Sequence, residues 1–189
     1  MIKYAIVGNI ASGKSEMERV LDKHNFVVLD TDLITHDILI DRPDVSKAFC
    51  EEDVFEYGKL SKDKLGKLIF SQPELKTKLE EIVHPLILEE LENAFKVYSD
   101  EPYIFVSVPL LYEAGWENVF DKVIFIKADD DIRLKRLIER NGYSEEYAQT
   151  RINSQAPQDE KIQKSDVIIE NNGSKEEFIA KIEDFISSL

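Results

Sequence analysis

The chain has 189 residues, of which 43% are hydrophobic and 33% are charged, a composition typical of a globular protein with one substantial core. The net charge of −14 repels polyanions, so we expect no nucleic-acid partner, and no apolar run approaches the roughly 20 residues that a membrane-spanning helix needs. The single cysteine, Cys50, excludes an intrachain disulfide and favours a reducing compartment, so we expect a cytoplasmic protein with Cys50 as a small core residue.

Short apolar runs bounded by turn signals recur along the chain and are typical of strands buried on both faces. They predict five strands, namely Ile2–Val7, Phe26–Leu29, Tyr103–Val108, Lys122–Ile126 and Val167–Ile169. Helical periodicity predicts three helices between and after these strands, namely Gly13–Lys23, Asp130–Arg140 and Ser174–Ser187. This alternation indicates an α/β fold with a parallel five-stranded sheet flanked by helices, in which ligands bind beyond the carboxyl ends of the strands.

One interval breaks the alternation, because about seventy residues separate the second predicted strand from the third, far more than a crossover needs. Within it, Ser61–Phe70 and Glu74–Tyr98 carry helical periodicity. Pro85 should bend or break the second of these helices, since proline lacks an amide donor and crowds the preceding turn. We interpret the interval, about residues 36–99, as a helical sub-domain inserted into a single domain whose core is formed by residues 1–35 and 100–189.

The segment Gly8–Ser15, with the sequence Gly-Asn-Ile-Ala-Ser-Gly-Lys-Ser, matches the phosphate-loop pattern G-x-x-x-x-G-K-[ST]. It lies between a predicted strand and a predicted helix, where backbone N–H groups and the start of the helix bind phosphate. Lys14 can then reach the β- and γ-phosphates, and the Ser15 hydroxyl can ligate Mg²⁺. The alternative, an ordinary glycine turn, does not require this setting, so we predict binding of a nucleoside triphosphate with Mg²⁺.

The acidic motif Asp30-Thr31-Asp32 follows the second predicted strand, at the sheet edge where ligands bind. One carboxylate there could accept a hydrogen bond from a substrate hydroxyl, and the other could hold water around Mg²⁺. The alternative is helix capping, for which an aspartate is equally suited. The spacing alone leaves both interpretations open.

Arg133, Arg136 and Arg140 are spaced three and four residues apart, so they share one face of a predicted helix. The planar guanidinium group suits phosphate because it donates two hydrogen bonds at once. With Arg151 further on, we interpret residues 133–157 as a lid that closes on the triphosphate. The alternative is a solvated helix face that Glu139 partly balances.

His84 beside Pro85, and Glu113 after the third predicted strand, say little on their own. Taken together and in order, however, the motifs of this chain resemble those of the dephospho-CoA kinase family over essentially its whole length. The motifs that carry the resemblance are Gly8–Ser15, Asp30-Thr31-Asp32, His84-Pro85-Leu86-Ile87, Val108-Pro109-Leu110-Leu111-Tyr112-Glu113, Arg151-Ile152-Asn153-Ser154-Gln155 and Ser165–Gly173.

The resemblance implies transfer of a phosphoryl group from MgATP to the 3′-hydroxyl of dephospho-CoA, by a P-loop core with a helical CoA-binding sub-domain and a lid. It implies catalytic roles for Lys14, Asp32 and Arg140. It implies ATP binding by Gly8, Ala11, Ser12, Gly13, Lys14, Ser15, Glu16, Arg140, Asn172 and Gly173. It further implies substrate binding by Asp32, His84 and Glu113, an Mg²⁺ ligand in Ser15, and a water-mediated Mg²⁺ contact at Asp30. The implied partners are ATP and dephospho-CoA, and the oligomeric state is left open.

The phosphate loop departs from the family pattern, Gly-Gly-Ile-Gly-Ser-Gly-Lys-Ser-Thr, at Asn9, Ala11 and Glu16. Ala11 tolerates a positive φ less readily than glycine, so we expect either local strain or a negative φ at this position. Glu16 favours the first turn of the helix but repels phosphate, and the sequence does not decide which effect is larger.

Two other functional classes stay open. The first is another small-molecule P-loop kinase with the same core and a different helical insertion, which a screen of phosphate acceptors would distinguish. The second is a nucleotide-dependent switch without a small acceptor, which would hydrolyse ATP slowly and change its partner binding with the nucleotide.

Overall fold

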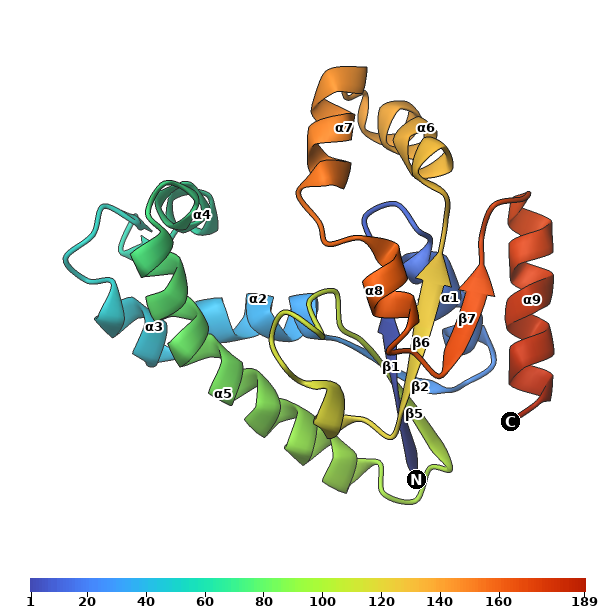
Figure 1. The fold of residues 1–189 in the computed structure, drawn as a ribbon. Coiled ribbons are helices and arrows are strands. Elements are labelled where there is room, and N and C mark those ends of the chain that lie inside the picture. The colour runs from blue at the N-terminus through green and yellow to red at the C-terminus, as the bar shows by residue number, and fades with distance from the viewer. The chain divides into compact units, whose positions relative to one another are not determined.

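The computed structural model describes residues 1–189, except for the side chain of Asp41. The chain divides into two compact units, the first formed by Met1–Leu29 with Ser99–Leu189 and the second by Asp30–Tyr98. The first unit carries the main sheet, and the second is mostly helical (Figure 1). The second unit begins earlier than the expected residue 36, because the helix that starts at Thr31 packs against the long helix of that unit.

The main sheet has five strands in the order β2-β5-β1-β6-β7. Their bounds are β1 Ile2–Val7, β2 Val27–Asp30, β5 Tyr103–Ser107, β6 Lys122–Lys127 and β7 Val167–Glu170. Strand β1 pairs in parallel with both β5 and β6, and β6 pairs in parallel with β7. The predicted α/β fold is confirmed, and the ends of the five predicted strands differ from the observed ones by at most one residue.

The core of the first unit lies between the sheet and two helices, α1 Lys14–Lys23 and α9 Lys175–Ser187, which contact each other. The strands contribute apolar runs that are almost fully buried, as expected for strands covered on both faces. The main cluster of buried residues includes Tyr4, Ile6, Met17, Val20, Leu21, Phe105, Ile124, Ile126, Ile169, Phe178 and Ile182. Burial of each such side chain stabilises the fold by roughly 1.5–3 kcal/mol, which fixes the strand ends that carry the site.

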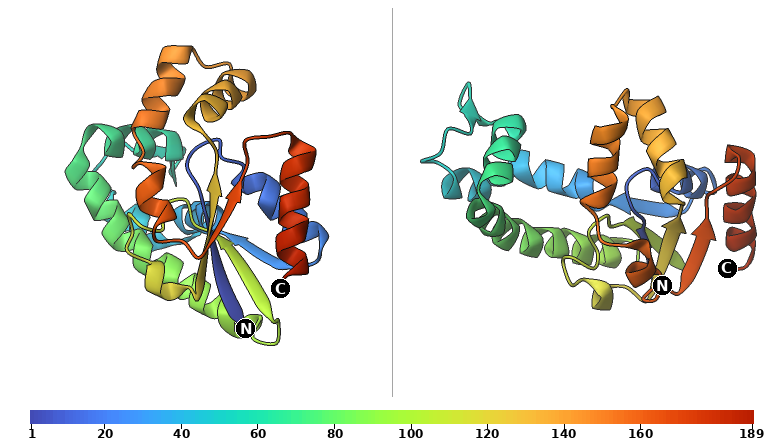
Figure 2. Two further views of the ribbon diagram at one scale, coloured as in Figure 1. Left: turned by 45° about the vertical axis from the view of Figure 1, so that its right-hand side comes forward. Right: turned by 45° about the horizontal axis from the view of Figure 1, so that its top comes forward.

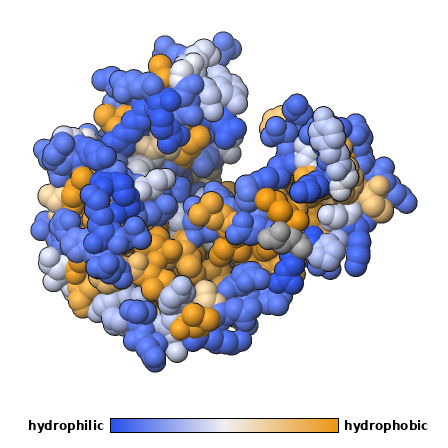
Figure 3. Space-filling model, turned by 180° about the vertical axis from the view of Figure 1, so that it is seen from behind, coloured by the Kyte–Doolittle hydropathy of each residue, from blue (hydrophilic) through white to orange (hydrophobic). Residues whose placement is uncertain are grey.

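Two further helices, α6 Asp130–Asn141 and α7 Glu145–Asn153, follow β6 and pack against each other (Figures 1 and 2). Gly142 ends α6 with a φ of 65°, the left-handed conformation that suits glycine at a helix end. Short helices complete the unit, namely η1 Glu117–Val119 and α8 Gln158–Ile162. In Figure 3 the upper part of the surface, which holds α6 and α7, is mostly hydrophilic, as expected for helices that bury one face only.

The second unit is built around a long helix, α5 Pro73–Val97. Its other elements are α2 Thr31–Asp41, α3 Pro43–Ala48, β3 Phe55–Glu56, β4 Lys59–Leu60 and α4 Lys62–Ser71. Helices α2, α3 and α4 all contact α5. Of the predicted bend or break at Pro85, the break is wrong, because α5 continues through this residue. Pro85 and Glu81, whose carbonyl loses its partner, are both exposed, so water can satisfy that group.

Cys50 is exposed, so its prediction as a core residue is wrong. Its neighbour Phe49 is fully buried and takes the core position at the end of α3. Among the described residues, no helix combines the length and the apolar character that crossing a membrane requires.

Candidate active site

The phosphate loop connects β1 to α1 at the carboxyl edge of the sheet and depends on two glycines. A Cβ atom on Gly8 would lie 2.9 Å from the carbonyl oxygen of Ile126, too close for any other residue. Gly13 has a φ of 113°, and a Cβ atom there would lie 2.3 Å from Nδ2 of Asn171. These contacts explain why the motif needs glycine at both ends of the loop.

Ala11 lies in the middle of the loop with a φ of 61°, so the alternative of a negative φ is wrong. A left-handed conformation costs a non-glycine residue roughly 1–2 kcal/mol. Two contacts oppose this cost. The Ala11 carbonyl oxygen accepts a hydrogen bond from Nη1 of Arg136 at 3.3 Å, and the residue packs against the apolar cluster between α6 and α7.

Helix α1 begins at Lys14 with Gly13 as its N-cap, and no described side chain caps it. The partial positive charge of such a helix start attracts anions. Lys14 donates a hydrogen bond from Nζ to the carbonyl oxygen of Gly8 at 3.2 Å, so its ammonium group lies across the mouth of the loop. Ser15, the second residue of α1, is exposed there.

A cavity of about 800 Å³ lies over the loop, within the size range of nucleotide and drug-sized ligand sites. It is lined by Asn9, Ile10, Ala11, Ser12, Gly13, Lys14, Ser15, Glu16, Arg136, Glu139, Arg140, Asn171, Gly173, Lys175 and Phe178. Four of these residues are cationic and two are anionic. The lining is therefore positive in a chain whose net charge is −14, which is the distribution that a polyphosphate ligand requires.

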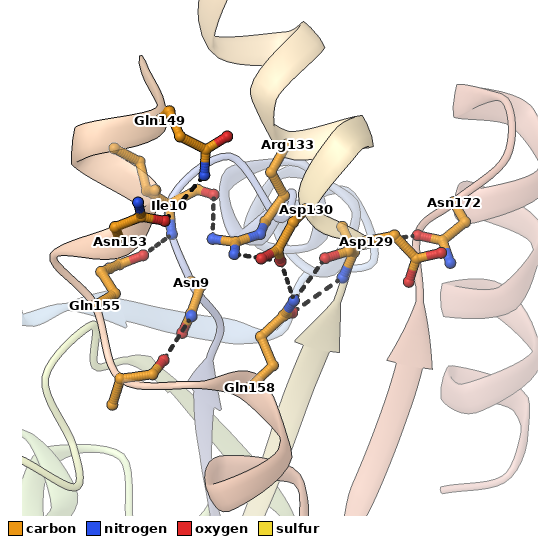
Figure 4. A network of polar contacts seen from close by, with 12 residues as sticks. Asn9, Ile10, Asp129, Asp130, Arg133, Gln149, Asn153, Gln155, Gln158 and Asn172 are labelled. Atoms are coloured by element: carbon orange, nitrogen blue, oxygen red, sulfur yellow. Dashed lines mark hydrogen bonds and ion pairs between the residues drawn. The ribbon is translucent and has the colours of Figure 1, made fainter. Parts of the chain in front are cut away.

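The three arginines of α6 have different surroundings. Arg133 is 2% exposed and pairs with Asp130 at 2.6 Å (Figure 4). Arg136 donates from Nη1 to the carbonyl oxygens of Ala11 and Ser12, at 3.3 and 3.4 Å. Burial lowers the pKa of Arg136, which nevertheless stays charged because an arginine titrates far above neutral pH. The interpretation as a solvated face is wrong for Arg133 and Arg136.

Arg140, in contrast, is exposed at the end of α6, where its Nε donates to Oδ1 of Asn141 at 2.9 Å. It lines the cavity together with Arg136. Of the three arginines, it is the one whose guanidinium is not held on the loop by a described contact and that can turn toward a ligand.

The loop after β7 closes another wall of the cavity. Asn171 is 5% exposed, donates from Nδ2 to the Ser12 carbonyl oxygen at 2.7 Å, and accepts from Nη2 of Arg136 at 2.9 Å. Asn172 instead accepts a hydrogen bond from the backbone N–H of Asp129 at 2.8 Å (Figure 4). The cavity is thus lined by Asn171 and Gly173, and Asn172 holds their loop in place.

Glu16 forms ion pairs with Arg19 and with Lys175, the latter at 3.0 Å. The hydrogen bond from Arg19 is the main reason why the pKa of Glu16 is lower than its ordinary value, and Lys175 adds to the effect. The carboxylate is therefore ionised but locally compensated, which reduces its repulsion of a phosphate ligand.

Glu113 accepts a hydrogen bond from Nζ of Lys161 at 2.8 Å. The Lys161 side chain is only 6% exposed, whereas Glu113 is 40% exposed, so a buried ammonium fixes a carboxylate that stays accessible. Tyr112 completes the arrangement by hydrogen bonding to the carbonyl oxygen of Lys161 at 3.1 Å. Burial raises the pKa of the Tyr112 hydroxyl, so this group remains protonated and donates.

The other predicted site residues lie in the second unit. Asp30 is the N-cap of α2, since its Oδ1 accepts from the backbone N–H of Asp32 at 2.8 Å. Capping is thus the role of Asp30 in the fold, while Asp32 is exposed in the first turn of α2. His84 is half-buried on α5, directly before Pro85. The substrate roles of Asp32 and His84 stay predictions.

Sequence reasoning did not single out several residues of the site. Lys175 and Phe178 line the cavity from α9, and Lys161 holds Glu113 from α8. A signal for Phe178 and Lys175 existed in the capping box of Ser174 and Glu177, which the structure confirms, because it places the first turn of α9 beside Gly173. For Lys161 there was no local signal, since its partner is far away in the chain.

The comparisons with known proteins agree with this geometry. The profile of the dephospho-CoA kinase family matches residues 2–177. A dephospho-CoA kinase of Geobacillus kaustophilus is 35% identical over 178 residues, which cover 91% of this chain and 89% of the relative. The solved dephospho-CoA kinase of Campylobacter jejuni is 30% identical with a TM-score of 0.78, over 98% of this chain and 96% of that one. The shikimate kinase of Bacteroides thetaiotaomicron, with 13% identity and a TM-score of 0.56 over 100% and 99% of the two chains, shares the fold alone.

The phosphate loop by itself is common to many kinases, and the fold extends to distant ones such as the shikimate kinase. The family profile is more specific, because its match runs from β1 into α9 and so includes the second unit as well as the loop. The chain therefore belongs to the dephospho-CoA kinase family.

Proposed function

We propose that this chain transfers the γ-phosphoryl group of MgATP to the 3′-hydroxyl of dephospho-CoA, giving coenzyme A and ADP. The observation that carries the proposal is the positively charged cavity over the phosphate loop, in a protein of the dephospho-CoA kinase family. Four cationic and two anionic residues line this cavity in a chain with 38 acidic and 24 basic residues, and this local excess of positive charge favours an anionic ligand.

On the ATP side, Lys14 would hold the β- and γ-phosphates, together with the backbone N–H groups at the start of α1. Arg140 would turn from Asn141 toward the transferring group, where a planar guanidinium neutralises charge on two oxygens. Asn171 and Gly173 place the loop after β7 at the cavity, where the adenine would bind, with Asn172 as the support of that loop.

Mg²⁺ would bind with the nucleotide at Ser15, whose exposed hydroxyl is an oxygen ligand of the kind that this ion prefers. When bound, Mg²⁺ supplies neutralisation of charge between the β- and γ-phosphates. Asp30 would act through water, because Oδ1 of its carboxylate accepts the capping hydrogen bond of α2.

On the acceptor side, Asp32 would orient the attacking hydroxyl and take up its proton. Because phosphoryl transfer has a loose transition state, proton removal contributes less than positioning. We assign His84 to the CoA-binding sub-domain and Glu113, fixed by Lys161, to substrate binding. A cytoplasmic location is part of the same proposal, and cell fractionation with an antibody to the chain would test it.

The test is release of ADP from MgATP, measured with dephospho-CoA and, in parallel, with adenosine, AMP, CMP and pantetheine phosphate. We expect turnover with dephospho-CoA alone and a product phosphorylated at the 3′-position. Turnover with another acceptor only would leave the assignment as a P-loop kinase intact and would overturn dephospho-CoA as the substrate. Tight binding of MgATP without turnover on any acceptor would instead favour a nucleotide-dependent switch.

A further inference from the structure

The chain leaves the lid through residues 155–157, which lie between α7 and α8, and two of these residues, Gln155 and Ala156, hydrogen bond to the phosphate loop (Figure 4). Oε1 of Gln155 accepts from the backbone N–H of Ile10 at 2.7 Å. Nδ2 of Asn9 donates to the carbonyl oxygen of Ala156 at 3.0 Å, and Asn9 is only 2% exposed. Two consecutive residues of the loop are therefore fastened to the same short segment.

The start of α6, where the chain enters the lid, is also attached to Ile10 of the phosphate loop. Nη1 of Arg133, in the first turn of α6, donates to the carbonyl oxygen of Ile10 at 3.5 Å. Asp130 accepts from Arg133 and also from Nε2 of Gln158, the latter at 3.1 Å. The two main-chain polar groups of Ile10 are thus bonded to the two ends of the lid, and Gln158 joins those ends to each other.

Apolar contacts act in the same direction. The side chains of Ile10 and Ala11 pack against the cluster that joins α6 and α7, formed by Leu137, Ala148 and Ile152. A displacement of the lid helices would release both the apolar contacts and the hydrogen bonds of Ile10. The left-handed conformation of Ala11, which the loop needs and alanine disfavours, would lose part of its support.

The attachment is also one that can open. A second cavity, of about 570 Å³, lies beside these hydrogen bonds and is lined by Asn9, Arg133, Gln155 and Gln158 among others. Hydrogen bonds beside a polar cavity can separate and be replaced by hydrogen bonds to water. The joint between lid and loop therefore combines the apolar contacts of Ile10 and Ala11 with a few specific hydrogen bonds, each of which a substitution can remove.

We propose that Gln155 and Asn9 are positioning residues for ATP: they fasten the exit segment of the lid to the phosphate loop and so couple the position of the lid to the affinity of the loop for phosphate. This inference rests on the use of ATP proposed above, and it does not depend on which acceptor is used. Gln155 is the better probe, because it is not among the described residues that line the phosphate cavity. Its side chain reaches the phosphate loop through the backbone N–H of Ile10.

The experiment compares Gln155→Leu with Gln149→Leu, the same substitution elsewhere in the lid. Nε2 of Gln149 donates to Oδ1 of Asn153 at 2.9 Å, a hydrogen bond that stays within α7. The dissociation constant of a fluorescent ATP analogue is measured without acceptor, and KM and kcat are then measured separately. We expect Gln155→Leu to weaken ATP binding roughly 2- to 10-fold, as for the loss of one partly buried hydrogen bond. We also expect it to raise KM for ATP and to leave KM for the acceptor unchanged.

A double variant gives an independent test. If Asn9→Ala and Gln155→Leu act through the same segment, the loss of ATP affinity in the double variant is smaller than the product of the two single losses. If one single variant folds poorly, the other still tests the attachment by itself, because Asn9 and Gln155 hold different atoms of the segment.

Reciprocity provides a readout that a merely structural role would not change. If the exit segment strengthens ATP binding, ATP must strengthen the attachment of the segment by the same factor. We expect bound nucleotide to slow trypsin cleavage after Arg151, an exposed residue of α7, in the wild type and in Gln149→Leu but less in Gln155→Leu.

Equal ATP affinity in Gln155→Leu and wild type would overturn the inference, as would equal weakening in Gln155→Leu and Gln149→Leu. Either result would leave the kinase assignment intact. A wild-type chain that bound no ATP would overturn both this inference and the proposed function, whereas ATP binding without turnover of dephospho-CoA would overturn the proposed acceptor alone.

Discussion

The starts of α1 and α9 lie beside the same cavity and are built in opposite ways. Helix α9 begins with a capping box, in which the Ser174 side chain and the Glu177 side chain satisfy each other's backbone N–H groups. Helix α1 begins with a left-handed Gly13 and without a described side-chain cap. Other helices of the chain also lack a described side-chain cap, but the start of α1 combines this lack with a place in the wall of the phosphate cavity. Of the two starts beside this cavity, the α1 start is therefore the one that leaves its N–H groups for a ligand.

The largest effect on activity is expected at the uncapped start of α1. Lys14→Ala removes the cation at the mouth of the loop, and kcat/KM should fall on the order of 10³-fold or more. Steady-state kinetics with MgATP and dephospho-CoA measures the loss, and circular dichroism checks that the fold is retained. A folded Lys14→Ala with nearly full activity would show that the Lys14 ammonium has no role in phosphoryl transfer.

At the start of a third helix, α2, the motif Asp30-Thr31-Asp32 divides two roles: Asp30 caps the helix, and Asp32 is the residue with the proposed catalytic role. Asp32→Asn removes a carboxylate but leaves the Asp30 cap, so kcat should fall on the order of 10²- to 10⁴-fold at saturating substrates while stability is unchanged. Asp30→Ala, the matched variant, should instead lower the free energy of unfolding by about 1 kcal/mol. If Asp32→Asn kept its kcat, the catalytic role of Asp32 would be wrong.

Arg140→Ala tests the wall of the cavity that faces the open start. Since Arg140 is exposed and bonded only to its neighbour Asn141 among the described contacts, its loss should leave thermal unfolding unchanged. Loss of a charged hydrogen bond to the transferring group should lower kcat roughly 10- to 100-fold. Unchanged kinetics would assign Arg140 to the solvated surface.

Ser174→Ala removes the side-chain cap from the start of α9 and so makes it resemble the start of α1. We expect the free energy of unfolding to fall by about 0.5–2 kcal/mol, because the hydroxyl accepts from the Glu177 N–H at 3.2 Å, while kcat is unchanged. Urea unfolding measures the first quantity. A Ser174→Ala variant with full stability but reduced activity would contradict the division between structural and functional helix starts.

The smallest effect concerns Glu16, which lies in the first turn of α1. The pKa of Glu16 is lowered below its ordinary value of 4.5, first by the hydrogen bond from Arg19, so its contribution to stability is present above pH 4.5. It is lost as the pH falls through the lowered pKa. Glu16→Gln should therefore lose less stability than the wild type on acidification, as thermal unfolding at several pH values would show. If the stability of Glu16→Gln and of the wild type fell identically at acidic pH, the ion pairs of Glu16 would not stabilise the fold.

Much of this fold could be predicted from the sequence, because the central strands are apolar runs of nearly their own length. Ile104–Val106 and Val123–Ile126 are examples in which every residue is buried. The hairpin β3–β4 has two residues in each strand, too few for a pattern. Helix α2 was indicated only by the capping alternative for Asp30-Thr31-Asp32, because its exposed Leu33 and Ile40 and its buried Ile38 do not form one apolar face.

The site was predictable where chemistry depends on neighbours in the chain and was not where it depends on distant contacts. The loop motif identified Gly8, Gly13 and Lys14 from local spacing. The spacing of the α6 arginines showed one shared face, but only the fold shows that Arg136 contacts the loop and Arg140 does not. The break predicted at Pro85 was wrong because the cost of a proline inside a helix depends on whether the preceding turn is exposed to water. No local sequence pattern reports that exposure.

The order of strands in the main sheet has a consequence for synthesis on the ribosome. Strand β1 is the third strand of the sheet, between β5 and β6, yet both partners follow the second unit in the chain. The second unit is contiguous, so it can fold as soon as residues 30–98 have left the exit tunnel. Until β5 and β6 emerge, the apolar segment Ile2–Val7 has both edges unpaired. We therefore expect the nascent chain to be most prone to aggregation, and most dependent on chaperones, while its first strand waits for partners made about a hundred residues later.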